Sequence, residues 1–278
     1  MRRSAGFTLV ELVMVIVIIA ILLPLAVVII KPIEGYIALD RRAELTDAAD
    51  SALRLMAREI RAALPNSVRV NATNDAIEFI NATDAGRYRL NGATANEVLN
   101  IGGPDTEFDI VGSFSQTTPG VQAGARLVVY NLGPGQAPYD AYLAAGTSAV
   151  MTPSTTSITV GAAGSGANAN EQHITLGAAH TFTGGSTRQR IFLVDGAITY
   201  ACAGTTLTRY SGYGFNAAIT VPPVGGSSAT TATSATGCTF TYAAGTPTRA
   251  GLVTISLTLS SGGETVTMFR QVRVDNAS

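Results

Sequence analysis

The stretch Gly6-Phe7-Thr8-Leu9-Val10-Glu11 stands between a short basic leader at residues 1–5 (MRRSA) and a long apolar run. The run covers the 24 residues 7–30 and is interrupted by few polar side chains, chiefly Thr8 and Glu11. A helix of that length rises about 36 Å, which is enough to cross a bilayer. The sequence therefore predicts a membrane-spanning helix over residues 7–30.

The flanks of this run predict its orientation and its kind. Arg2 and Arg3 precede it directly, and the positive-inside rule then favours a cytoplasmic N-terminus. The bias is modest, because further basic side chains follow at residues 31–42. A secretory signal fits poorly, since its apolar core is shorter and its small-residue cleavage site lies behind the core. A plain signal anchor has no reason to keep Glu11, because a carboxylate in a membrane helix is costly and usually has a partner.

The same stretch resembles the processing site of type IV prepilins and type II secretion pseudopilins. In those families a basic leader and a Gly precede Phe-Thr-Leu, a hydrophobic residue, Glu and a long apolar helix, and this chain matches each element. The resemblance implies that a membrane-embedded prepilin peptidase cuts between Gly6 and Phe7. It also implies that the same partner enzyme methylates the new amine of Phe7.

The resemblance also gives Glu11 a role in assembly. Cleavage leaves a charged amine at Phe7, one helical turn from the Glu11 carboxylate. In a bundle of subunits, Glu11 of one chain can pair with the Phe7 amine of another, and each charge costs far less in low dielectric when it is paired. A pair within one chain and a protonated Glu11 stay open as alternatives.

A second helical pattern follows the apolar run. Pro24 removes one helical hydrogen bond and predicts a kink within the run. Beyond it, residues 33–64 carry apolar side chains at helical spacings, with charged residues on the other face, and Pro65-Asn66 should end the helix. The predicted apolar stripe consists of Ile37, Leu45, Ala48, Ala52, Leu55, Met56, Ile60 and Ala63.

The rest of the chain reads as a β-rich head. The clearest hairpin has strands at 252–259 and 264–274 around a turn at 260–263. Residues 161–170 and 222–237 are rich in Gly, Ala, Ser and Thr and are predicted to be exposed loops. The other predicted strands cover residues 76–80, 87–90, 126–132, 157–160, 190–200, 205–210 and 238–242.

These segments predict the domain organisation. It comprises a cleaved leader at 1–6, a transmembrane and filament-core helix at 7–30, an amphipathic helix at 31–66 and a periplasmic head at 67–278. The expected fold class is α+β, with one long N-terminal helix packed on a β-rich head. That is the architecture of the type IV pilin fold, which the resemblance implies.

The chain has two cysteines, Cys202 and Cys238. In an exported chain they suggest one disulfide. It would close a loop of 37 residues and stabilise the head by roughly 4 kcal/mol in the chain-entropy model. Two buried free thiols are the alternative.

The C-terminal part narrows the resemblance. The stretches RQRIFLVDGAITYACAGTTLTRYSGYG (188–214), CTFTY (238–242), TRAGLVTISLTL (248–259) and QVRVDNAS (271–278) resemble the MshO-type minor pilins of mannose-sensitive haemagglutinin (MSHA) pili. They resemble PilW-type minor pilins and J-type pseudopilins more loosely. This likeness implies that Cys202 and Cys238 pair and tie two head strands together. Residues 90–188 carry no such resemblance.

Several kinds of chemistry find no support in the sequence. His173 and His180 are the only histidines, and a spacing of seven is not a usual zinc arrangement. The acidic stretch at 102–109 (GGPDTEFD) lacks the alternation of a calcium loop and is predicted to be a turn. Phosphate-loop and Gly-x-Ser-x-Gly motifs are missing. We therefore predict no catalytic residues, no metal, no cofactor and no enzyme.

Charge argues against nucleic acid as a general partner. The formal net charge is −1. Without Arg2 and Arg3, 16 basic side chains stand against 19 acidic ones, and the net charge is −3. Nucleic-acid affinity comes largely from phosphate neutralisation, so the chain as a whole offers no reason for it. A local basic patch on the folded head stays open. The aromatic and Gly-rich run at 210–215 (YSGYGF) predicts either a packed loop or a contact with a ligand or neighbouring subunit.

Together these observations predict a minor pilin that serves as a structural or assembly subunit of a type IV, MSHA-like pilus. It would act at or near the filament tip. A tip adhesin and a minor pseudopilin of a type II secretion system are the alternatives. The expected partners are the prepilin peptidase and N-methyltransferase, other major and minor pilins, and the inner-membrane assembly platform. The chain would sit single-pass in the inner membrane with a periplasmic head, and then in a pilus at the cell surface.

Overall fold

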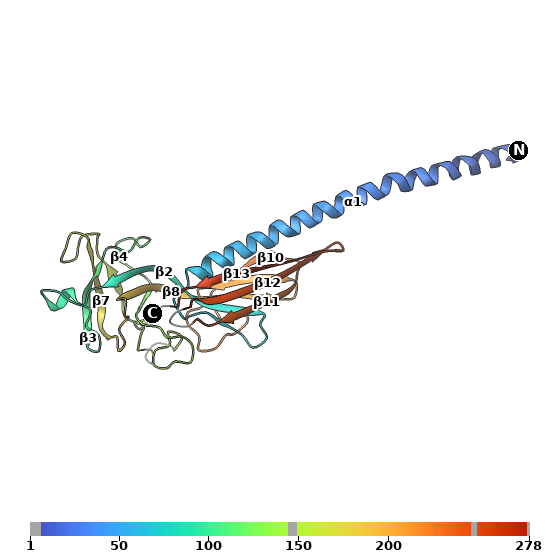
Figure 1. Cartoon of the computed structure of the whole chain (residues 1–278). Coiled ribbons are helices and arrows are strands. Elements are labelled where there is room, and N and C mark those ends of the chain that lie inside the picture. The colour runs from blue at the N-terminus through green and yellow to red at the C-terminus, as the bar shows by residue number, and fades with distance from the viewer. Residues whose placement is uncertain (1–6, 144–148, 246–248, 277–278) are drawn as a thin grey trace, which may run out of the picture.

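The computed structural model describes residues 7–143, 149–245 and 249–276, except for the side chains of residues 25–34. Helix α1 (Leu9–Arg61) has 53 residues and rises about 80 Å. Figure 1 shows its C-terminal part lying along a β-rich head and its N-terminal part extending far beyond the head. The α+β class that the sequence predicts is confirmed, and the arrangement is consistent with the type IV pilin fold.

Helix α1 ends three residues earlier than predicted. The N–H of Ala62 donates to the carbonyls of Arg58 (3.2 Å) and Glu59 (3.1 Å), which closes the last turn. The next residues already join the sheet, because Ala63 forms a β-bridge with Asn81 and the N–H of Leu64 donates to Ile80 O (2.9 Å). Pairing with the sheet therefore competes with the helix before Pro65 is reached.

The head contains two antiparallel sheets. The larger has the path β10-β9-β8-β2-β3-β7-β6-β4, with β1 beside β2 and β5 beside β8, and the smaller has the order β11-β12-β13. The elements of the larger sheet are β1 (Arg69–Val70), β2 (Ala76–Tyr88), β3 (Pro104–Val111), β4 (Gly120–Val121), β5 (Arg126–Val128), β6 (Ile158–Val160), β7 (Glu171–Thr181), β8 (Arg190–Ala203), β9 (Thr206–Ser211) and β10 (Ser227–Thr233). The smaller sheet consists of β11 (Ala235–Ala243), β12 (Gly251–Ser261) and β13 (Glu264–Val274), and a short 3-10 helix η1 covers Ala95–Glu97.

The C-terminal hairpin forms as predicted. Strands β12 and β13 pair without a register shift up to Ser261 and Glu264. The two residues between them, Gly262 and Gly263, have φ of 56° and 90°. A two-residue turn with two positive φ angles matches the twist of the strands, and glycine adopts it without strain.

Other strand predictions need correction. The predicted strand 76–80 and the first two residues of the predicted strand 87–90 belong to the single strand β2. This strand continues through register shifts between Asn81 and Asp84 and ends at Tyr88. The stretch at 102–109 forms most of β3 instead of a turn, and β7 was not predicted. The predicted strand 126–132 stops at Val128, and Tyr130 has a positive φ of 62°.

The predicted loop at 222–237 is also partly wrong. Residues 227–233 form the edge strand β10 against β9, and β11 begins at Ala235. Small polar residues carry little hydrophobic signal, yet Ala232 is buried beneath α1. The loop predicted at 161–170 contains no strand.

The buried apolar side chains form three clusters. The first joins α1 to strands of both sheets and contains Leu53, Phe79 and Phe240. The second fills the part of the head around β3, β6 and β7 with Phe108 and Ile174 among its members. The third lies at the end of α1, around Leu64 and Tyr142. Among the described residues, helix α1 thus joins the core only through its C-terminal half.

Candidate functional site

The N-terminus of α1 is built around Thr8 and Glu11. Thr8 is the N-cap, and its hydroxyl accepts the N–H of Glu11 at 3.3 Å. The Glu11 carboxylate approaches the same hydroxyl at 3.5 Å. The N-cap hydroxyl thus satisfies one N–H of the first turn, and the carboxylate lies at the start of the helix, where a negative charge is favoured. Gly6, at the predicted cleavage site, lies outside the described residues.

Residues 7–24 are exposed on every side of the helix. Phe7 is 78% exposed, Leu12 55% and Leu23 63%. Among the described residues, nothing in the head covers this segment, and it contributes to none of the three core clusters. A helix that is apolar all round is stable when lipid or other helices surround it.

The predicted transmembrane helix lies only partly within the described side chains, because those of residues 25–34 are outside them. Within the residues that the structure describes, no helix is long and apolar enough to qualify as a membrane span. Helix α1 continues through Pro24. The kink there stays a prediction.

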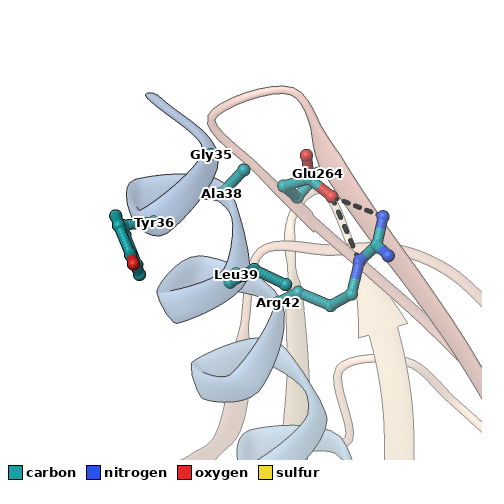
Figure 2. A pocket seen from close by; sticks show the side chains of 6 residues that line it. All are labelled: Gly35, Tyr36, Ala38, Leu39, Arg42 and Glu264. Carbon is teal, nitrogen blue, oxygen red and sulfur yellow. Dashed lines mark hydrogen bonds and ion pairs between the residues drawn. The ribbon is translucent and has the colours of Figure 1, made fainter. Parts of the chain in front are cut away.

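Helix α1 leaves the head beside the tip of the β12–β13 hairpin. An open hollow of about 560 Å³ lies there, lined by Gly35, Tyr36, Ala38, Leu39, Arg42 and Glu264. Figure 2 shows Arg42 reaching from the helix to Glu264 on the hairpin, with Tyr36 pointing away. Arg42 and Glu264 form an ion pair at 2.8 Å, and the guanidinium of Arg41 donates to the carbonyl of Gly262 at 3.1 Å. These contacts fix the last point at which the head touches the helix in the described region.

From this point towards its C-terminus the helix packs on the head along a stripe that overlaps the predicted one. The predicted positions that are buried are Leu45, Ala52, Met56, Ile60 and, just after the helix, Ala63. Ala48 is exposed and Ile37 is 44% exposed, whereas Ala49, Leu53 and Ala57 are buried. The full buried set is Leu45, Ala49, Ala52, Leu53, Met56, Ala57 and Ile60. The many alanines of this segment carry too weak a signal to fix which of them face the sheet.

A polar anchor supplements this apolar contact. Glu59 of α1 accepts the hydroxyl of Tyr200 on β8 (2.7 Å) and the Nε of Arg209 on β9 (3.0 Å). Burial, together with the nearby Glu59 carboxylate, raises the pKa of Tyr200, so the phenol stays protonated and donates. No local sequence pattern predicts this contact, because its members are about 140–150 residues apart.

The two cysteines are joined by a disulfide, with their Cα atoms 6.1 Å apart. Cys202 lies on β8 and Cys238 on β11, so the bond connects the larger sheet to the smaller. Both side chains border the cluster on which α1 packs. The bond therefore holds together the two sheets that form the seat of the helix.

A buried charge network lies where β1, β2 and β8 meet. Glu78 is fully buried and forms an ion pair with Arg69, and it also accepts the hydroxyls of Tyr213 (2.9 Å) and Thr199 (3.0 Å). The Arg69 guanidinium lies 3.6 Å from the centre of the Tyr142 ring. Every group here is paired within the head, so the network is structural. The network includes Tyr213 of the run at 210–215, so this tyrosine packs into the head.

His173 lies between two carboxylates of β3. Its Nδ1 is 2.7 Å from Asp109 and its Nε2 is 3.3 Å from Glu107. Burial lowers its pKa, but the hydrogen bonds and charges of the two acids outweigh this effect, so the pKa is raised. The sequence placed no acidic residues near this histidine because β3 was predicted to be a turn. The described residues contain no group of three or more side chains arranged to hold a metal ion.

Comparison with known families finds one match. The family model described as the prokaryotic N-terminal methylation motif matches residues 1–23, which include the leader, the predicted cleavage site and much of the exposed apolar segment. Comparisons with curated proteins and with solved structures found no match. The match supports a type IV pilin-like or pseudopilin subunit and suggests a membrane-anchored chain.

Proposed function

We propose that this chain is a minor pilin, a structural or assembly subunit of a type IV pilus of the MSHA kind. The observation that supports it most is the continuity of two features. The methylation motif at residues 1–23 runs into a helix segment whose apolar side chains are exposed on all sides. A structural subunit needs such a segment, whereas an enzyme's active site does not.

The exposed apolar segment needs other molecules to cover its side chains, because the rest of the chain does not bury them in the described structure. Burying a Val, Leu or Ile side chain is worth about 1.5–3 kcal/mol, and residues 9–23 contain mostly such side chains. Lipid would cover them before assembly, and neighbouring pilin helices would cover them afterwards. On this proposal the chain lies single-pass in the inner membrane with a cytoplasmic N-terminus, and moves into the filament through the assembly platform.

Processing would precede assembly. We infer that the prepilin peptidase cuts between Gly6 and Phe7 and that Phe7 is then N-methylated. The new amine and the Glu11 carboxylate lie within about one helical turn of each other. Pairing Glu11 of one subunit with the Phe7 amine of the next would set the register of packing with other major and minor pilins. The exposed position of Glu11 leaves it accessible to such a partner.

The substitution Glu11→Ala tests this role. Processing should stay intact, because the residues at the cut are unchanged, while incorporation into the filament falls strongly. The measurement is immunoblotting of cell-bound and sheared-filament fractions, with the mobility shift of cleavage as the processing readout. Glu44→Ala is the matched control, since Glu44 is an exposed carboxylate on the head-bound half of the same helix. Normal incorporation of Glu11→Ala would refute the assembly role of the carboxylate.

A pseudopilin of a type II secretion system is the second candidate, because the observation that favours a pilin, the methylation motif, is shared by both. Deletion of the gene separates them. Loss of surface filaments supports the pilus subunit, whereas normal filaments with failed protein secretion support the pseudopilin. A position near the filament tip predicts that gold-labelled antibody to the head marks filament ends and not their length.

A further inference from the structure

A second hollow lies on the head, far in sequence from the N-terminal helix. It is an open hollow of about 690 Å³, bordered by strands β2, β3 and β8 and the turn before β8. Of the described residues that line it, three are arginines and none is acidic. The lining consists of Ala85, Gly86, Arg87, Val111, Ser113, Thr187, Arg188 and Arg190.

The fold brings these arginines together from distant positions. Arg87 on β2 lies directly opposite Arg190 on β8 in the antiparallel ladder. Like charges at such a cross-strand position destabilise the pair. The chain as a whole has a net charge of −1, so this concentration of positive charge is local. An anion held between the arginines would offset the repulsion.

Arg188 is presented by a turn with fixed geometry. The buried Ser186 accepts the backbone N–H groups of Arg188 (3.3 Å) and Arg190 (3.1 Å) through its hydroxyl. Its carbonyl accepts the hydroxyl of the buried Tyr88 at 3.2 Å. The turn is therefore tied to the core, and it holds the backbone of the exposed Arg188 beside the hollow.

Two carboxylates near the hollow have partners of their own. Asp275 pairs with Arg190 at 3.3 Å from an exposed position, with 69% of its side chain accessible. Asp84 is buried and accepts the backbone N–H groups of residues 115–117. Among the described residues, the lining itself contributes no carboxylate.

The lining indicates the class of ligand. Guanidinium groups bind carboxylate oxygens in a planar, bidentate manner. The hydroxyls of Ser113 and Thr187 suit the hydroxyls of a sugar, and Val111, which is 45% exposed, offers an apolar surface to a ring. The size is that of a small-ligand site. The lining contains no aromatic side chain for base stacking, which single-stranded nucleic-acid sites use.

We propose that the hollow of Arg87, Arg188 and Arg190 binds the carboxylate of an acidic sugar, such as a uronate unit of a polysaccharide. The site is separate from the N-terminal helix, so it stands independently of the pilus proposal.

The test is calorimetric titration of the full chain in detergent micelles with a galacturonate trimer. Arg188→Gln should weaken binding about tenfold, and Arg87→Gln combined with Arg188→Gln about a hundredfold, as expected for the loss of one and two charge-assisted contacts. Arg58→Gln, which removes the same charge from an exposed site on α1, should bind as the parent does. The melting temperature of each variant checks that the head is folded.

Parallel titrations separate the possible ligands. A neutral galactose trimer should bind at least tenfold more weakly than the galacturonate trimer, and equal binding would refute the role of the arginines. Inorganic phosphate binding as tightly as the trimer would refute the sugar part of the site. Tighter binding of short duplex DNA, lost in the same arginine variants, would replace the saccharide by nucleic acid. Absence of trimer binding to the parent chain overturns the proposal outright.

Discussion

The two halves of helix α1 have opposite relations to the head. Residues 7–24 are exposed all round, whereas residues 45–60 turn a continuous buried stripe onto both sheets. The first half is almost entirely Val, Ile and Leu, while the second uses small side chains such as Ala49, Ala52 and Ala57 at its contact. Small residues let the helix backbone approach a sheet closely. Bulky apolar residues on every face suit a surrounding of lipid or other helices.

The two halves therefore serve different ends, one the stability of the head and the other the proposed assembly. The head fold depends on the second half of α1, and the proposed assembly depends on the first. A substitution in one half should therefore be nearly silent in the assay that reports on the other.

The largest expected effect is that of Leu53→Ala, which should lower the free energy of unfolding of the head by about 2–5 kcal/mol. Leu53 is 1% exposed at the centre of the cluster between the helix and the sheets, so the shorter side chain leaves a cavity. Leu12→Ala makes the same chemical change in the exposed half and should alter that free energy by less than about 0.5 kcal/mol. Denaturant unfolding of the full chain in micelles measures both. Equal losses would break the distinction between the halves.

A smaller effect is expected at the polar anchor. Glu59→Gln removes the charge that Arg209 pairs with, and should cost about 1–3 kcal/mol in the same unfolding measurement, because a partly buried guanidinium loses its counter-ion. Glu44→Gln is the matched control on the exposed face of the helix. A neutral result for Glu59→Gln would mean that apolar packing alone seats the helix.

The smallest effect is expected at His173, which lies away from α1. It tests whether the stability of the head depends on pH independently of the helix. The folded-state pKa of His173 is raised, so its ion pairs with Asp109 and Glu107 contribute fully below the unfolded pKa of about 6.5 and are lost as pH rises through the folded pKa. The contribution should be below about 1 kcal/mol.

The other histidine acts in the opposite sense. Burial lowers the pKa of His180, so its contribution is lost as pH falls. The difference in melting temperature between the parent and His173→Asn, followed from about pH 5 to pH 8, isolates His173. The parent should lose its advantage as pH rises, and a constant difference would contradict the assignment.

Much of this architecture could be predicted from local sequence signals. The segment from Gly6 to Glu11 and the apolar run after it predicted a long apolar helix, and their resemblance to the prepilin pattern implied the fold class. The β12–β13 hairpin was equally legible, since alternation and a Gly-Gly turn are properties of neighbouring residues.

Local signals could not predict the contacts that depend on the register between distant strands. Strand β10 is built from Ser, Thr and Ala, and only its place between β9 and the helix makes it a strand. His173 meets Asp109 because β3 and β7 pair, and Arg87 meets Arg190 because β2 and β8 pair. The phase of the helix stripe had the same difficulty, because Ala48 and Ala49 differ only in which of them the sheet covers.

The tip of the β12–β13 hairpin has a mechanical consequence. It touches the helix through Arg41 and Arg42, and beyond that point 32 residues of α1 project towards the N-terminus. A rigid helix of that length is a lever of roughly 48 Å, and a tilt of about 5° at the hairpin would move its far end by about 4 Å. A small shift of the turn at Gly262, whose carbonyl accepts from Arg41, would therefore change where the first residue of the helix points.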